Sequence, residues 1–129
     1  MMLTPSCFLC LFSSFAQVDS GVNSNPESLN RVRSMVTPMQ AGNLFVHNLD
    51  LCDAIALKAT LKAISQTKKI DACVHFAGLK AVGESTKMPL RYHQNNVTGT
   101  LNLLQVYAGM REERSGFRDQ PFFRNLLAH

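Results

Sequence analysis

Short apolar runs alternate with helix-length segments along the middle of the chain, and this alternation constrains the fold more than any other feature. The apolar runs lie at residues 44–46 and 70–76, and helical patterns precede, separate and follow them. A helix between two strands makes a crossover connection, which joins parallel strands of one sheet. The sequence therefore predicts an α/β fold with a few parallel strands and flanking helices.

A capping pattern predicts the first helix. Ser24-Asn25-Pro26-Glu27 supplies a polar cap, a proline for the first helical position and an acid for the first turn. We expect the helix to continue to Val36 and to stop before Pro38, because proline cannot continue a helix. Gly42 then marks a turn into the first apolar run.

Two further helices are predicted after that run. Asp53 is expected to cap a helix from Ala54 to about Lys69, and Ser85 to cap a longer, kinked helix from Pro89 to about Gly109. Apolar residues at helical spacing predict the buried face of each helix. They are Leu57, Leu61 and Ile64 on the first helix, and Leu90, Val97, Leu101, Leu104 and Ala108 on the second.

The composition fits one small globular domain. Among 129 residues, 46% are hydrophobic and 17% are charged, which are ordinary values for a folded chain. No apolar run approaches the roughly 18 residues of a membrane-spanning helix, so we expect no membrane partner. The net charge of +4 is spread along the chain, so we expect no nucleic-acid partner. Cys7 and Cys10 form a lone C-x-x-C without further ligands, and reduced thiols in a cytoplasmic protein are expected.

The two ends of the chain differ from its middle. For residues 1–17, two interpretations stay open: a signal peptide that ends near Ala16, or a replacement strand at residues 7–12. Residues 110–129 show no sustained period and are expected to form an unrelated, disordered tail. Residues 18–109 carry the regular pattern and make up the predicted domain.

Candidate binding residues follow the two apolar runs. In open parallel sheets, ligands bind beyond the carboxyl ends of the strands. Asp50 follows the first run and can accept a hydrogen bond from a hydroxyl or amino group of a nucleotide. Ala77 and Gly78 follow the second run and allow close approach to the backbone, and Lys80 is available for an anionic or hydroxylated group.

Three other polar residues are interpreted without a function. His75 and Cys73 lie within an apolar run, and we expect both to be core residues. Asn96 begins an N-x-T glycosylation sequence, but it falls inside a predicted helix, so we expect no attached glycan.

The residues Val74 to Ser85, which read VHFAGLKAVGES, closely resemble the UDP-glucose 4-epimerase family of extended short-chain dehydrogenases/reductases. The resemblance covers about residues 18–108. Its other matching segments are residues 26–29, 31–32, 50–51, 87–92, 95–100 and 103–104. It implies a partial Rossmann-like, three-layer fold that binds NAD.

The resemblance implies roles for the matching residues only. Asp50 and Leu51 correspond to residues that contact the adenine of NAD, and Asp19 corresponds to an acid that holds the adenosine ribose. Asn95 corresponds to a helix residue near the nicotinamide. The loop that runs along the cofactor corresponds to Phe76, Ala77, Gly78, Leu79 and Lys80.

Three parts of the family's machinery have no match in this sequence. Residues 1–17 contain no glycine, whereas the family opens with a G-x-x-G-x-x-G turn that receives the NAD pyrophosphate. Neither Tyr92 nor Tyr107 has a lysine four residues later, as the family's Tyr-x-x-x-Lys pair requires, and the UDP-sugar domain has no counterpart. We therefore expect this chain, alone, to be inactive toward UDP-glucose and UDP-galactose.

Two classes of function stay open. The first is a part of an NAD-dependent UDP-glucose 4-epimerase of galactose metabolism. The second is a non-catalytic truncated product that binds nucleotide weakly or pairs with other subunits. The family dimerises through two helices per subunit, and the predicted helix from Pro89 to Gly109 resembles one of them, which implies a homodimer through this helix.

Overall fold

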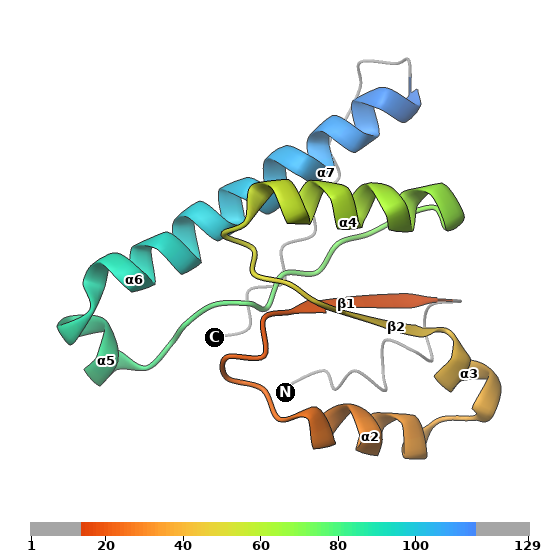
Figure 1. The fold of residues 1–129 in the computed structure, drawn as a ribbon, viewed down its shortest axis with the longest axis horizontal. Helices are drawn as coiled ribbons and strands as arrows, with labels where there is room; N and C mark the ends of the chain where they lie inside the picture. The colour runs from red at the N-terminus through yellow and green to blue at the C-terminus, as the bar shows by residue number, and fades with distance from the viewer. Residues whose placement is uncertain (1–13, 116–129) are drawn as a thin grey trace. The chain divides into compact units, whose positions relative to one another are not determined.

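The chain divides after Leu49 into an N-terminal unit, Met1–Leu49, and a C-terminal unit, Asp50–His129. The computed structural model describes residues 14–115 of the two units (Figure 1). The interpretations of residues 7–12 and of the chain beyond residue 115 fall outside these residues. Phe15 and Ala16, at the end of the signal-like pattern, lie in a strand. No helix in the described part of the chain is long and apolar enough to cross a membrane.

The N-terminal unit contains a strand, two helices and a second strand. These elements are β1 (Phe15–Asp19), α2 (Pro26–Met35), α3 (Pro38–Gly42) and β2 (Leu44–Asn48). The two strands pair in parallel, with Phe15 opposite Leu44 and Asp19 opposite Asn48. A parallel pair joined through helices is the arrangement that the alternating sequence pattern predicts.

Local capping signals set the helix boundaries in this unit. The Asn25 side chain accepts a hydrogen bond from the Glu27 backbone N–H at 3.0 Å, which confirms the predicted start of α2. Pro38 stops α2 as predicted, but it also begins α3, which the sequence analysis missed. Thr37 and Gln40 form a reciprocal capping box for this short helix. Val32 of α2 and Leu44 of β2 are the buried centre, and the residues packed against them are Phe15, Leu29 and Val36.

The C-terminal unit is built on two neighbouring helices, α4 (Ala54–Thr67) and α7 (Gly99–Ser115), which run side by side (Figure 1). Asp53 caps α4 as predicted, because its carboxylate accepts a hydrogen bond from the Ala56 N–H at 2.9 Å. Leu57 is fully buried and Leu61 is buried, so the predicted apolar face of α4 is confirmed.

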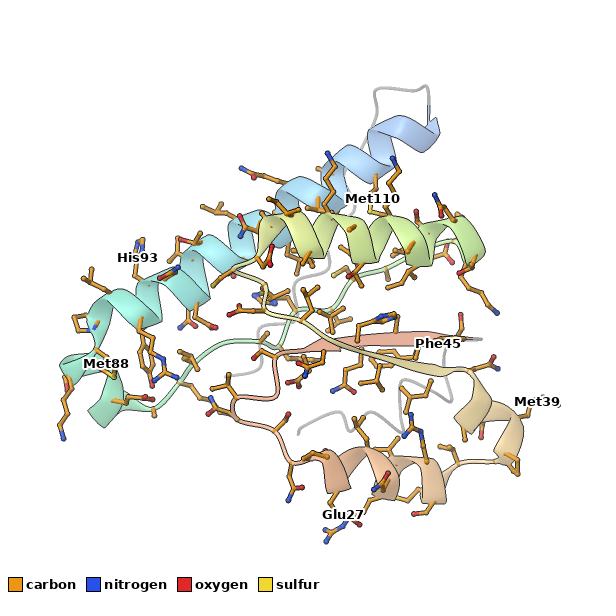
Figure 2. All side chains as sticks on the ribbon, viewed as in Figure 1. Glu27, Met39, Phe45, Met88, His93 and Met110 are labelled. Carbon is orange, nitrogen blue, oxygen red and sulfur yellow. The ribbon has the colours of Figure 1, made fainter. Side chains whose placement is uncertain are left out.

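A π-helical turn interrupts the long helix that was predicted from Pro89. The structure has α5 (Val82–Lys87), α6 (Pro89–His93), the π turn η1 (Gln94–Thr98) and then α7. Figure 2 labels Met88 and His93 at the two ends of α6, and Met110 in α7. The predicted cap at Ser85 is wrong, since Ser85 lies inside α5 and its hydroxyl donates to the Val82 oxygen at 2.7 Å. The helix also continues to Ser115, beyond the predicted end at Gly109.

The apolar line predicted for this helix is not its buried face. Leu90, Val97 and Leu101 are 84%, 42% and 50% exposed. Tyr92, Leu103 and Tyr107 are buried instead. A π turn adds one residue to a helical turn, so it rotates the residues that follow relative to a continuous 3.6-residue period. The prediction assumed one unbroken period.

The strand predicted at residues 70–76 is wrong. These residues are extended, but they pair with no strand in the part of the chain that the structure describes; the paired strands there are β1 and β2. One backbone oxygen of the segment accepts a hydrogen bond from a helix side chain instead. The Tyr107 hydroxyl donates to the Asp71 oxygen at 3.3 Å. An apolar run becomes a strand only where a second backbone lies alongside it.

Candidate functional site

Asp19 lies at the end of β1 and organises the loop that follows. Its Oδ1 accepts hydrogen bonds from the Gly21 N–H at 2.7 Å and from the Ser24 hydroxyl at 3.1 Å. Gly21 has a φ of 74°, a conformation that glycine adopts without strain. The structure thus gives Asp19 a local structural role in the N-terminal unit, while all other candidate residues lie in the C-terminal unit.

Asp50 and Leu51 form a tight turn before α4. The Asp50 carboxylate accepts the Cys52 N–H at 2.8 Å, and the Asp50 carbonyl accepts the Asp53 N–H at 3.0 Å. Asn102, on α7, donates its side-chain Nδ2–H groups to the backbone oxygens of Leu51 and Cys52, at 3.0 and 3.3 Å. The turn is therefore fixed both by its own acid and by the helix.

Gly99 permits the close approach of the helix to this turn. A β-carbon at Gly99 would lie 3.2 Å from the Leu51 Cβ, which is tighter than an ordinary contact. A larger residue at this position would push Leu51 away, so glycine allows the observed spacing.

The loop from Phe76 to Lys80 is held by two adjacent asparagines of η1. Asn95 donates to the Ala77 oxygen at 3.1 Å. Asn96 accepts the Leu79 N–H and donates to the Leu79 oxygen, both at 2.8 Å. The Gly78 N–H bonds to the Phe76 oxygen at 2.9 Å and closes a three-residue turn.

The residues of this loop are exposed except for Leu79, which is partly buried. Phe76 is 49% exposed, and Ala77, Gly78 and Lys80 are exposed as well. The two ion pairs of the described residues, Lys69 with Asp71 and Arg91 with Glu84, do not involve Lys80. The loop thus presents apolar surface, small residues and a cation to solvent.

His75 has the hydrogen-bond partner expected of a core histidine, but its side chain is only partly buried. Its Nε2 lies 2.8 Å from the Thr100 hydroxyl oxygen, and that hydroxyl donates its only proton to the Asn96 backbone oxygen. Thr100 can therefore only accept from the imidazole, which assigns the Nε2–H form to His75. Burial lowers the pKa of His75 and raises the pKa of the neighbouring Cys73 thiol.

Tyr92 is not prepared to act as a base. Its hydroxyl donates to the Glu84 carboxylate at 2.8 Å, and Arg91 bonds to the other oxygen of the same carboxylate. Burial, followed by the hydrogen bond to Glu84, raises the pKa of Tyr92. A tyrosine that takes a proton near neutral pH needs a lowered pKa instead.

The structure thus brings Asn95 together with the Phe76–Lys80 loop. Sequence reasoning missed the residues that hold the two loops: Asn96 was considered only as a glycan acceptor, and Asn102 and Thr100 were not considered. A usable signal was present, because asparagine has low helix propensity and interrupts an apolar helix here twice. Within the described ranges, no three His, Cys, Asp or Glu residues are grouped to hold a metal.

A parallel strand pair connected through helices, with an exposed loop of small residues after an extended segment, defines a partial Rossmann-type α/β fold. Residues 13–118 match the family model described as GDP-mannose 4,6 dehydratase. The chain belongs to this family of extended short-chain dehydrogenases/reductases.

Within that family, the chain is similar to UDP-glucose 4-epimerases. It is 49% identical to UDP-glucose 4-epimerase 2 of Arabidopsis thaliana over 92 residues, which are 70% of this chain and 25% of the relative. The UDP-glucose 4-epimerase from Bifidobacterium longum, solved in complex with NAD+ and UDP, superposes with a TM-score of 0.64 and 33% identity. That match covers 80% of this chain and 29% of the other.

A second solved epimerase structure also superposes on this chain. The UDP-glucose-4-epimerase from Stenotrophomonas maltophila, with bound NAD and formylated UDP-arabinopyranose, superposes with a TM-score of 0.60 and 32% identity. That match covers 74% of this chain and 26% of the other. The chain therefore spans about a quarter of the length of the relatives it matches.

Proposed function

We propose that this chain carries cofactor-contacting loops of an NAD-dependent UDP-glucose 4-epimerase, the isomerase of galactose metabolism that interconverts UDP-glucose and UDP-galactose in the cytoplasm. The family membership and the exposed Phe76–Lys80 loop support this proposal. NAD, when bound, supplies the hydride acceptor of such a reaction. The residues of this chain would bind and orient it.

The observation that carries the proposal is the exposure of Ala77, Gly78 and Lys80 in the loop that resembles the family's cofactor loop. A β-carbon at Gly78 would meet only the Asn96 Oδ1, at the ordinary contact distance of 3.9 Å. Protein packing therefore leaves room for a side chain at Gly78, in contrast to Gly99. A glycine on an exposed loop without a packing requirement fits a surface that a ligand approaches closely.

The proposed contacts follow the two loops. Asp50 and Leu51 would contact the adenine, and the residues from Phe76 to Lys80 would lie along the cofactor. Asn95 would face the nicotinamide side through its Oδ1, since its Nδ2 bonds to the Ala77 oxygen and to Asn96. Asp19 is proposed for the adenosine ribose.

The 129-residue chain alone is proposed to be catalytically inactive. No tyrosine in it has a lysine four residues later, and the raised pKa of Tyr92 is opposite to what a base needs. A coupled assay that converts UDP-galactose to UDP-glucose should therefore give no turnover above the control without protein. Measurable turnover would contradict this proposal.

Cofactor binding is tested with a pair of glycine variants. The wild-type chain should bind NAD with a Kd above about 1 mM, because the helix-terminus site for pyrophosphate has no match in this sequence. In saturation-transfer NMR, Gly78→Ala should abolish the signal from NAD without lowering the melting temperature. The matched control, Gly83→Ala, has open space around its β-carbon and should bind as the wild type does. Equal NAD signals from both variants would contradict the role of Gly78.

A second candidate function is subunit pairing without catalysis. Leu90, Val97 and Leu101 leave an apolar line exposed on the helix that resembles a family dimer helix. Sedimentation equilibrium should show self-association that Leu101→Lys weakens, while Ile55→Lys, an exposed position on α4, leaves it unchanged. A wild-type chain that stays monomeric at roughly 100 µM would exclude subunit pairing.

A further inference from the structure

The side chain of Asn96 takes the place of a neighbouring strand for Leu79. Its Oδ1 accepts the Leu79 N–H and its Nδ2 donates to the Leu79 oxygen, each at 2.8 Å. A carboxamide has one acceptor and one donor side, so it can satisfy both backbone groups of one residue. Asn95 adds a hydrogen bond to the Asn96 Oδ1 at 2.9 Å, which fixes the orientation of the amide.

Asn102, six residues later in the chain, holds the other loop through its donor side alone. Its Nδ2 donates to the backbone oxygens of Leu51 and Cys52. Gly99, between the two asparagines, lets the helix lie against Leu51. Each of the two loops is thus fastened through its backbone to the segment from Asn96 to Asn102, whatever side chains the loops carry.

We propose that Asn96 and Asn102 are positioning residues, which hold the two candidate cofactor loops at a fixed spacing on one helix. The continuous helix backbone between the two residues keeps their spacing constant. The inference rests on the proposed function, because that function makes these loops the NAD-contacting elements. Neither asparagine contacts the cofactor; each acts through a loop backbone.

The burial and chemistry of the two residues support this role over simple helix stability. Asparagine disfavours helix interiors because its side chain competes for backbone groups. Both side chains are partly buried, and both bond to loop backbone atoms that lie 17 to 51 residues away in sequence. A side chain that disfavours its own helix and bonds a distant backbone specifies where that distant loop lies.

The first test measures hydrogen exchange at the Leu79 amide in the complete 129-residue chain, relative to the amides of α4. Asn96→Ala removes the acceptor and should increase Leu79 exchange at least about tenfold. Asn96→Asp keeps an acceptor but, at neutral pH, loses the donor to the Leu79 oxygen. Protonation of that aspartate restores a donor and an acceptor, so protection of Leu79 should rise as the pH falls through the carboxyl titration.

A purely structural role for Asn96 predicts another result. It would give Asn96→Ala and Asn96→Asp the same pH profile of Leu79 protection. That outcome, or a Leu79 amide that exchanges in the wild type as fast as in Asn96→Ala, overturns the proposal.

The second test asks whether a loop that is no longer held also binds NAD more weakly. Asn102→Ala should increase exchange of the Cys52 and Asp53 amides at least about tenfold and should weaken the saturation-transfer signal of NAD. Gln105→Ala is the matched control, because it removes an exposed carboxamide from the same helix and should change neither.

The outcomes separate this inference from the proposed function. If the wild-type chain binds no NAD, the proposed function fails, while the exchange data still decide whether Asn96 and Asn102 hold the loops. If the wild type binds NAD and Asn102→Ala binds it equally well with faster exchange, the proposed function stands and the positioning role is overturned.

Discussion

The two units hold their extended segments in different ways. In the N-terminal unit, β1 and β2 pair through backbone hydrogen bonds along five residues each. In the C-terminal unit, the extended segment before α5 is held by the side chains of Tyr107, Thr100 and Asn96. Backbone pairing tolerates most substitutions, whereas a segment held by side chains depends on each of them. The C-terminal unit should therefore be the more sensitive to single substitutions at its helix.

Truncation of Leu57, in the core of the C-terminal unit, should have the largest effect on stability. Leu57 is fully buried in α4, and Leu57→Ala should destabilise its unit by about 2–5 kcal/mol through lost burial and a cavity. Such a loss is comparable to the total stability of a small domain. Thermal unfolding followed by circular dichroism measures it. The matched control is Ile55→Ala, which changes an 85% exposed residue of the same helix and should be nearly neutral.

A substitution at the close contact between Gly99 and Leu51 should have the next largest effect on stability. Gly99→Ala places a β-carbon 3.2 Å from Leu51 and should destabilise the C-terminal unit by about 1–3 kcal/mol, because the turn must move. Gly109→Ala lies on the same helix with nothing within 4 Å of its β-carbon. It should instead stabilise the helix by about 0.5–1 kcal/mol. Denaturant unfolding that shows equal changes for the two variants would contradict the close approach at Gly99.

The helix caps should have equal effects in the two units. Asn25 caps α2 and Asp53 caps α4, each through a side-chain oxygen that accepts a backbone N–H. Asn25→Ala and Asp53→Ala should each cost about 1 kcal/mol, since a cap acts on its own helix and not on how strands are held. Amide exchange in the first turn of each helix checks this. If only one of the two substitutions lowers stability, the two units differ in their helices as well as in how they hold their extended segments.

The smallest expected effect is a dependence of stability on pH in the C-terminal unit. Burial lowers the pKa of His75 from its usual value of 6.5, so the folded state favours the neutral ring. Below that value the unfolded chain binds the proton more readily, and stability should fall. The contribution is fully present above pH 6.5. Melting temperatures between pH 7.5 and 5.5 should decrease in the wild type and in His93→Gln, and less in His75→Gln.

Local signals predicted much of the fold. Asn25 and Asp53 were identified as caps because a cap depends on a few neighbouring residues. The run at residues 70–76 has the composition of a strand, but pairing depends on a second backbone that the run itself does not encode. The π turn at Gln94–Thr98 likewise has no local sequence signal, and it rotates Leu101, which follows it, away from the buried face.

The candidate site likewise contains residues that the sequence predicted and residues that it did not. The loop residues follow an apolar run, so the strand-end rule and the family resemblance both indicated Gly78 and Lys80. The residues that hold the loops were missed, because Asn96 and Asn102 act through hydrogen bonds to backbone far away in sequence. Only the three-dimensional structure brings these partners together.

The most direct test of the account is a titration of the ¹⁵N-labelled chain with NAD, followed by amide chemical shifts. The account predicts progressive shifts at Asp50 and Leu51 and at the residues from Phe76 to Lys80, with a Kd above about 1 mM. The same titration of Gly78→Ala should leave these amides in place. Shifts confined to other residues, or a Kd well below about 1 mM, would contradict the account.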